Sequence, residues 1–259
     1  MNTTAQIKTS SIPPGSIGLW WLGQSGYALK NPSGEIIYID PYLTDTISAG
    51  YRPYIHARLI PPVIDPGADI PVGAVLLTHD HQDHLDPNSI VILSENPKVR
   101  FFGSAPVHQK LTEVLDIPDG SVQALELNES AVIGEYRITA VKAVHSGGAI
   151  GYIVQSDGLT LYFSGDTILF AGMKTIGQAF PIDYAFLCIN GQLGNMDVRS
   201  AVHAVKLLHP GTIIPNHYGM YADNTVDPEK FAYLLAEQYP QCKCLIMQPG
   251  ELTILKKSE

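Results

Sequence analysis

The sequence predicts an α/β fold, and three observations support this class. The first part of the chain is rich in short runs of aromatic and β-branched residues, separated by turns that contain Gly, Asn or Pro. Further along, short apolar runs alternate with segments of helical periodicity. Histidines and aspartates follow directly after several of these apolar runs, and α/β folds keep their reactive groups on loops held by a rigid sheet.

The N-terminal part is predicted to form strands joined by tight turns. Strands are expected at residues 17–22, 27–30 and 36–40, because these runs are rich in Trp, Tyr, Leu and Ile. Turns are expected at 23–26 and 31–34, where Gly, Asn, Pro and Ser gather. This part of the chain therefore starts the fold as a sheet.

A long segment without periodicity, residues 42–71, follows these strands. It is rich in proline and contains Tyr51, Arg52, Tyr54, His56 and Arg58. A connection of this length without secondary structure of its own is usually functional or disordered. Its aromatic residues and arginines favour an ordered cover over an active site.

The remainder of the chain alternates strands with helices. Strands are predicted at 74–78, 99–102, 122–127, 136–144, 151–155, 159–164, 183–189, 213–214, 245–247 and 251–255. Helices are predicted from Pro87 to 94, over 106–115, and after the N-caps Asp197 and Asp227 to 208 and 238. No linker divides the chain, so residues 1–259 are expected to form a single domain.

Composition narrows the classes of function. The chain of 259 residues is 45% apolar and carries a net charge of −9, which argues against a general nucleic-acid binder. It has no signal-peptide pattern at its start and no apolar run near the ~20 residues that cross a bilayer, so we expect a cytoplasmic protein without membrane contact. Three cysteines, an odd number without metal spacing, are expected to be reduced thiols.

The HxHxDH motif at residues 79–84 is the most informative stretch of the chain. Its potential metal ligands are His79, His81, Asp83 and His84. Imidazole nitrogen and carboxylate oxygen suit zinc, manganese and iron. Because Asp83 and His84 are adjacent, the two pairs cannot all face one point. The motif therefore indicates two ions a few ångströms apart, which is typical of hydrolases.

Three further ligands are expected at the ends of later strands, and they are His145, Asp166 and His217. The first ion would be held by His79, His81 and His145, and the second by Asp83, His84 and His217. Asp166 has two oxygens and can bridge both ions. Two divalent ions are thus expected, zinc or manganese, with iron as a further candidate. Asp40 ends a strand in the same region and is expected to orient a histidine.

These motifs resemble those of the metallo-β-lactamase superfamily, in the same order, and the resemblance runs from about residue 18 to 255. It implies an αββα sandwich, in which two mixed β-sheets pack face to face with helices on the outer faces. A closer resemblance is to the L-ascorbate-6-phosphate lactonase (UlaG-like) branch. It rests on Ile39-Asp40-Pro41, residues 58–62, Asn190-Gly191 and Gly194-Asn195-Met196.

The resemblance implies a hydrolase that opens the lactone of a small sugar acid, such as L-ascorbate 6-phosphate. A hydroxide between two ions would be the nucleophile, because the ions lower the pKa of bound water. Asp83 and Asp166 would serve catalysis as well as metal binding, and Tyr218 or Asn190 would stabilise the oxyanion.

The substrate is expected to be a small anion. Arginine presents a planar fork that matches phosphate or carboxylate, so Arg52 or Arg58 is expected to bind the anionic group. Asn190 and Asn195 would donate hydrogen bonds to other substrate oxygens. If neither arginine binds the anion, Lys174 and Arg199 are the next candidates.

A phosphodiesterase or nuclease with the same ligands is the main alternative. Ribonucleases of the superfamily usually add a substrate arm or inserted domain, and the chain shows neither such an insertion nor a basic tract. A β-lactamase would be expected to carry a signal peptide and a different sixth motif residue than His84. A non-enzymatic metal-binding protein fits poorly with a complete ligand set beside a cover segment. A homo-oligomer is left open.

Overall fold

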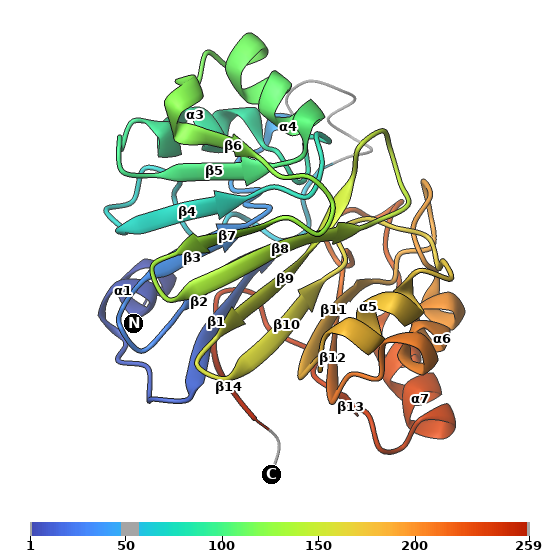
Figure 1. Cartoon of the computed structure of the whole chain (residues 1–259). Helices are drawn as coiled ribbons and strands as arrows, with labels where there is room; N and C mark the ends of the chain where they lie inside the picture. Colours follow the sequence, from blue (N-terminus) through green and yellow to red (C-terminus); the bar gives the residue numbers. More distant parts are fainter. Residues whose placement is uncertain (1, 48–56, 258–259) are drawn as a thin grey trace.

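The computed structural model describes residues 2–47 and 57–257, whose strands form two seven-stranded mixed sheets (Figure 1). The first sheet has the order β14-β1-β2-β3-β4-β5-β6. Its strands are β1 (Ser16–Gly23), β2 (Gly26–Lys30), β3 (Ile36–Ile39), β4 (Val72–Leu76), β5 (Arg100–Gly103), β6 (Val122–Ala124) and β14 (Leu252–Lys256).

The second sheet has the order β13-β12-β11-β10-β9-β8-β7. Its strands are β7 (Ser130–Ile133), β8 (Tyr136–Lys142), β9 (Ile150–Ser156), β10 (Leu159–Phe163), β11 (Tyr184–Cys188), β12 (Thr212–Asn216) and β13 (Lys243–Cys244). Each sheet combines antiparallel and parallel pairs, so both are mixed as predicted.

Alternation along β1 explains how the layers stack. Ile17, Leu19 and Trp21 point into a core shared by both sheets, whereas Trp20 and Leu22 point to the opposite face. All five side chains are buried, because helices cover that opposite face. The result is an αββα sandwich, which confirms the predicted layer order.

The helices cover the outer faces of the sheets (Figure 1). Beside the first sheet lie α1 (Thr3–Thr9), α3 (Pro87–Ser94), α4 (Ala105–Gln109) and the π-helical turn Lys110–Val114. Beside the second sheet lie α5 (Met173–Ala179), α6 (Val198–Leu208) and α7 (Pro228–Gln238). Asp197 closes a capping box with Ser200 at the start of α6, and Asp227 caps α7, both as predicted. No helix within the described residues is long and apolar enough to cross a membrane.

A few elements differ from the sequence predictions. Residues 245–247 form no strand, although Leu245 N donates to the Ile213 carbonyl oxygen of β12. The prediction was wrong because a three-residue apolar run is too short to show periodicity. The edge strand β7 was not predicted, nor were α1 and α5. The helical pattern of α5 is hard to recognise in the sequence because Gly177 lies within it. A Cβ at Gly177 would lie 2.5 Å from the Leu207 carbonyl oxygen of α6. That glycine permits the close packing of two helices rather than ending one.

The strand directions determine where the functional loops meet. β1, β3 and β4 run in one direction in the first sheet. In the second sheet β8, β10, β11 and β12 also share a direction. Because the carboxyl ends of strands that run together lie at one edge, the loops that follow these strands converge there.

Candidate metal centre

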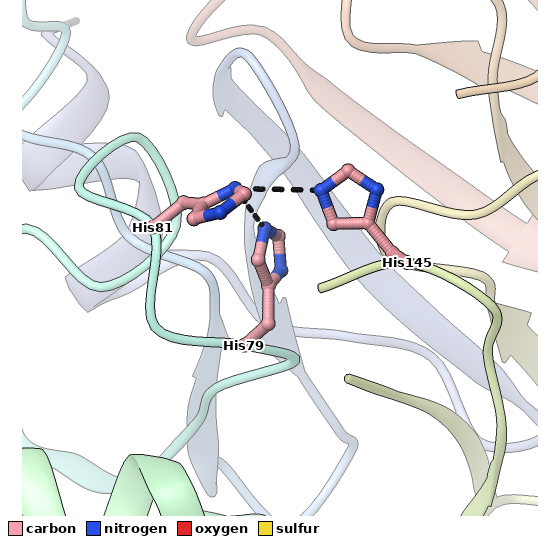
Figure 2. A group of neighbouring side chains, drawn as sticks. All are labelled: His79, His81 and His145. Carbon is pink, nitrogen blue, oxygen red and sulfur yellow. Dashed lines mark hydrogen bonds between the residues drawn. The ribbon is translucent and has the colours of Figure 1, made fainter. Parts of the chain in front are cut away.

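Three histidines at this edge turn their ring nitrogens toward one another (Figure 2). His79 and His81 follow β4, and His145 follows β8. His81 Nδ1 lies 3.0 Å from His79 Nε2 and 3.4 Å from His145 Nε2. His145 Nδ1 lies 3.3 Å from the Gly194 carbonyl oxygen, which can only accept, so this bond leaves Nε2 free as a ligand. The predicted first ligand set is therefore brought together.

The predicted second ligand set also gathers. Asp83 and His84 come from the loop after β4, and His217 comes from the end of β12. His217 Nε2 lies 3.4 Å from Asp83 Oδ2, and His84 Nε2 lies 3.8 Å from the same oxygen. One ligand atom from each residue lies within 4.8 Å of the others, which is close enough to share an ion.

Asp166, at the end of β10, lies between these two groups. Its Oδ1 is 3.2 Å from His84 Nε2, and its Oδ2 is 3.2 Å from His217 Nε2 and 3.8 Å from His145 Nε2. The carboxylate is 4% exposed, so solvent does not screen these contacts. Its place fits the predicted bridging ligand.

A layer of buried side chains orients the ligands. Asp40 Oδ2 lies 2.7 Å from His84 Nδ1, and Thr78 donates to Asp40 from both its main-chain N and its hydroxyl, at 2.8 and 2.7 Å. Since the carboxylate accepts from His84 Nδ1, Nε2 is left to face an ion. Asn195 Nδ2 donates to Asp166 Oδ2 at 2.8 Å. The orienting role predicted for Asp40 thus has a geometric basis, with Thr78 as an unpredicted partner.

Gln24 is a site residue that the sequence analysis missed. It lies in the turn between β1 and β2, is fully buried, and donates from Nε2 to Asp83 Oδ2 at 2.8 Å. Its Nε2 also lies 3.2 Å from His217 Nε2, and its main-chain carbonyl oxygen accepts from the His217 main-chain N. A glutamine in a Gly-rich turn resembles an ordinary turn residue, and only its position at a strand end could have indicated this role.

Three of these residues adopt the left-handed backbone conformation that favours glycine. Their φ angles are +53° for Gln24, +42° for Asp40 and +58° for His217. The conformation costs roughly 1–2 kcal/mol for a residue with a side chain. Each of them aims a side chain at the centre, so this strain is concentrated where the ligands are positioned.

The residues fit a bound metal. Among the described residues, His84 Nε2 and Asp166 Oδ1 are buried and form no hydrogen bond of good geometry, although they lie 3.2 Å from each other. An ion would satisfy both atoms, and a set of imidazoles and carboxylates without thiolate suits zinc, manganese or iron.

Burial and neighbouring charge act in opposite directions on these groups. Burial lowers the pKa of His79 and of His81. Burial would also lower the pKa of His217, but Asp166 and Asp83 outweigh it and raise that pKa to about 9. The pKa of His84 is raised in the same way by Asp166, Asp40 and Asp83. Without metal, the centre therefore holds protons beside its carboxylates.

Metal affinity is expected to rise with pH up to about 9. Below the raised pKa of His217, an ion must displace a proton to bind. Each displaced proton makes the affinity fall about tenfold per pH unit as the pH is lowered. Competition against a chelator of known pH dependence, between about pH 6.5 and 8.5, measures this. Equal affinity across that range would show that no ligand proton is displaced.

Of the two predicted anion-binding arginines, the structure describes Arg58. Arg52 lies outside the described residues. The Arg58 side chain is 2% exposed and donates to the carbonyl oxygens of Ile60, Tyr42 and Thr44 at 3.0, 3.2 and 2.7 Å. Its guanidinium also lies 4.4 Å above the Tyr42 ring. These contacts fit a role in holding the segment to the protein rather than in binding substrate.

The other predicted substrate contacts have different surroundings. The Tyr218 ring packs on Trp21 with centroids 5.0 Å apart, and burial raises the pKa of its phenol. Adjacent residues of the turn point to opposite sides, so His217 faces the centre and Tyr218 faces the core. Asn190 donates to Asn224 at 2.8 Å. The expected oxyanion role of Tyr218 has no contact among the described residues to support it, and Asn195 donates to Asp166. The predicted contact of Asn195 with substrate stays a prediction.

The described ends of the segment 42–71 pack beside the centre. Leu59 N donates to the Met220 carbonyl oxygen at 2.8 Å, three residues after His217. Tyr42, Met220 and Tyr221 form a small buried cluster with Ile60 packed against it. Residues 42 and 59–60 of the proposed cover thus contact the loop that follows the metal ligand His217.

Known proteins are similar to this chain in sequence. A family model described as a beta-lactamase superfamily domain matches residues 36–218. A UPF0173 metal-dependent hydrolase of Sulfurisphaera tokodaii is 32% identical to the chain, covering 90% of this chain and 97% of its own. Another, from Pyrococcus furiosus, is 31% identical, with coverages of 89% and 96%.

Solved structures share the fold. Igni18, described as a novel metallo hydrolase from Ignicoccus hospitalis, matches with a TM-score of 0.72 at 26% identity, covering 93% of this chain and 99% of its own. The metallo-beta-lactamase fold protein YhfI from Bacillus subtilis matches with a TM-score of 0.68 at 15% identity, with the same coverages. With its histidine and aspartate centre at the shared sheet edge, the chain belongs to the UPF0173 metal-dependent hydrolases of the metallo-β-lactamase superfamily.

Proposed function

We propose that the protein is a dinuclear metal hydrolase that opens the lactone ring of a small sugar acid. The position of Asp166 is the observation that supports a centre of two ions. Its two oxygens lie 3.2 Å from His84 and His217, and Oδ2 also lies 3.8 Å from His145. One carboxylate beside two three-residue groups would suit two neighbouring ions.

The chain's own residues hold and orient the reactive groups. Bound divalent ions would supply Lewis acidity and a water of lowered pKa. Asp40 keeps the His84 proton on Nδ1, and Asn195 holds Asp166 Oδ2 in place. Gln24 Nε2 holds Asp83 Oδ2 next to His217. This second layer fixes the geometry before substrate arrives.

The lactone is favoured over a phosphodiester by sequence and charge. The motifs around Asp40, Asn190 and Asn195 resemble the L-ascorbate-6-phosphate lactonase branch, and a net charge of −9 disfavours nucleic acid. Within this proposal the segment 42–71 covers the cleft, and Arg52 is the remaining arginine there for an anionic substrate group.

Turnover of two substrate classes tests this proposal. The metal-loaded protein is expected to hydrolyse sugar lactones, phosphorylated ones included, with a higher kcat/KM than bis(p-nitrophenyl) phosphate. Metal-stripped protein and the Asp166→Ala variant are the controls for contaminating activity. A kcat/KM for the phosphodiester about tenfold above that for every lactone would favour the phosphodiesterase instead.

A further inference from the structure

The candidate metal centre is open to solvent on the side of its first ligand group. His81 of that group is exposed, whereas His84 and His217 of the second group are buried. A substrate that reaches the centre therefore passes close to His81. Polar groups of the protein beside this histidine are placed to meet the part of the substrate that is not being hydrolysed.

Lys110 lies beside the exposed ligand. It begins the π-helical turn that follows α4, and its Nζ donates to the main-chain carbonyl oxygen of Asp80, between His79 and His81. Among the lysines and arginines of residues 2–47 and 57–257, it is the one whose side chain forms a hydrogen bond to the loop 79–84. Turns of this kind are rare and are frequently found at functional sites.

The ammonium of Lys110 carries a charge that its protein contacts do not neutralise. Its hydrogen bond goes to a neutral carbonyl oxygen, and the ion pairs of the described residues do not include it. Burial lowers the pKa of this half-buried lysine, and the negative charge of Asp80 opposes that shift. Charged groups that leave water are usually paired. Because an ammonium has three N–H donors, the bond to Asp80 leaves two for an anion.

The cations predicted from the sequence to bind an anion are placed differently. Arg58 donates to carbonyl oxygens of its own segment, and Arg52 lies outside the described residues. Lys174 lies on α5 and Arg199 on α6, in the helical layer that covers the second sheet. Lys110 is thus a cation of the ligand loop itself, and it comes from the layer of the first sheet.

We propose that Lys110 binds the anionic group of the substrate, so that the centre selects lactones that carry a phosphate. A phosphate offers several acceptor oxygens to the two N–H donors that remain, and a lysine binds it as a point charge. The selection of a lactone rests on the proposed function. The binding of phosphate by Lys110 does not depend on which bond is hydrolysed.

Turnover of a phosphorylated sugar lactone and of the same lactone without phosphate tests this selection. Lys110→Met should lower kcat/KM for the phosphorylated lactone at least about tenfold, mainly through KM, and should change it less than about twofold for the neutral one. Lys110→Gln, which removes the charge but keeps an N–H donor, should show the same split. Lys98→Met removes an exposed charge at the other end of β5 and is the matched control.

Calorimetric titration of the metal-loaded proteins with inorganic phosphate needs no turnover, so it separates this inference from the proposed function. Lys110→Met should bind phosphate about tenfold more weakly than the parent, and Lys98→Met should equal the parent. Melting curves and elemental analysis establish that the variants are folded and loaded.

Equal phosphate affinity in the parent and Lys110→Met overturns the proposal, and so does an equal loss of turnover on the two lactones. Loss of metal from both Lys110→Met and Lys110→Gln would assign the lysine to holding the ligand loop, which also overturns it. A parent that shows the difference in phosphate affinity but hydrolyses no lactone contradicts the proposed function alone.

Discussion

Asp166→Ala will reduce metal content below the parent's value and lower kcat/KM by about 10³-fold, or roughly 4 kcal/mol of transition-state stabilisation. The reason is that this one carboxylate lies beside ligands of both groups, so its removal weakens each. It also removes one of the acids that balance the charge of His84 and His217. Elemental analysis of metal per chain, with turnover on the best substrate, measures both effects.

Asp80→Ala is the matched control for that experiment. Asp80 lies within the same hexapeptide, but its side chain belongs to neither ligand group and does not lie beside Asp166 among the candidate ligands. Its main-chain carbonyl oxygen accepts from Lys110 Nζ, and its carboxylate acts on the charge of the same lysine. It should keep parent metal content and activity. A full metal complement with near-parent turnover in Asp166→Ala would refute the bridging role.

Asp40→Asn is expected to weaken metal affinity by about 10- to 100-fold, although Asp40 is not a ligand. Its carboxylate accepts from His84 Nδ1 and from Thr78. His84 Nδ1 and the Thr78 hydroxyl share Oδ2, whereas Thr78 N donates to Oδ1. An asparagine has only one acceptor oxygen, so its amide N–H would oppose either the His84 N–H or the Thr78 main-chain N–H. Asparagine tolerates a left-handed backbone as well as aspartate does, so the φ of +42° adds no new strain.

The affinity of this variant is measured by chelator competition beside a melting curve. Asp65→Asn removes an equal charge at a distant turn, where the side chain caps Gly67 N, and serves as the control. If Asp40→Asn held metal as tightly as Asp65→Asn, His84 would not need its carboxylate partner. A lower melting temperature without metal, and equal affinity, would indicate a purely structural role.

The sequence predicted the parts of the protein that local chemistry determines. Strands such as β4 and β10 are mostly apolar, and candidate ligands follow them within a few residues, so both elements and ligands could be recognised in order along the chain. Asp197 and Asp227 were recognisable as caps because a cap depends only on its own helix. Asp40 could be anticipated because a strand end near the motif is a natural place for an orienting carboxylate.

What the sequence could not predict depends on which way a side chain points. The sequence indicated that Arg58 binds an anion, but its guanidinium donates to the main-chain carbonyl oxygens of Ile60, Tyr42 and Thr44. No local sequence pattern marks these three acceptors. Tyr218 follows a ligand directly, yet the left-handed turn at His217 sends the two side chains apart. Gln24 is 59 residues from Asp83, and only the folded sheet brings them to 2.8 Å.

The ligand groups also join the two halves of the sandwich. Each of the predicted three-residue groups takes two side chains from the loop after β4 in the first sheet and one, His145 or His217, from a strand end of the second. Any ion held this way is a cross-link between two layers that are otherwise joined by apolar packing and by hydrogen bonds such as that from the Tyr152 hydroxyl to the Leu77 carbonyl oxygen, at 3.0 Å. The layers can then separate only after the ion dissociates, so metal exchange governs how often the interior opens. The lifetime of the folded chain in the presence of proteases therefore depends on how much metal is available to it.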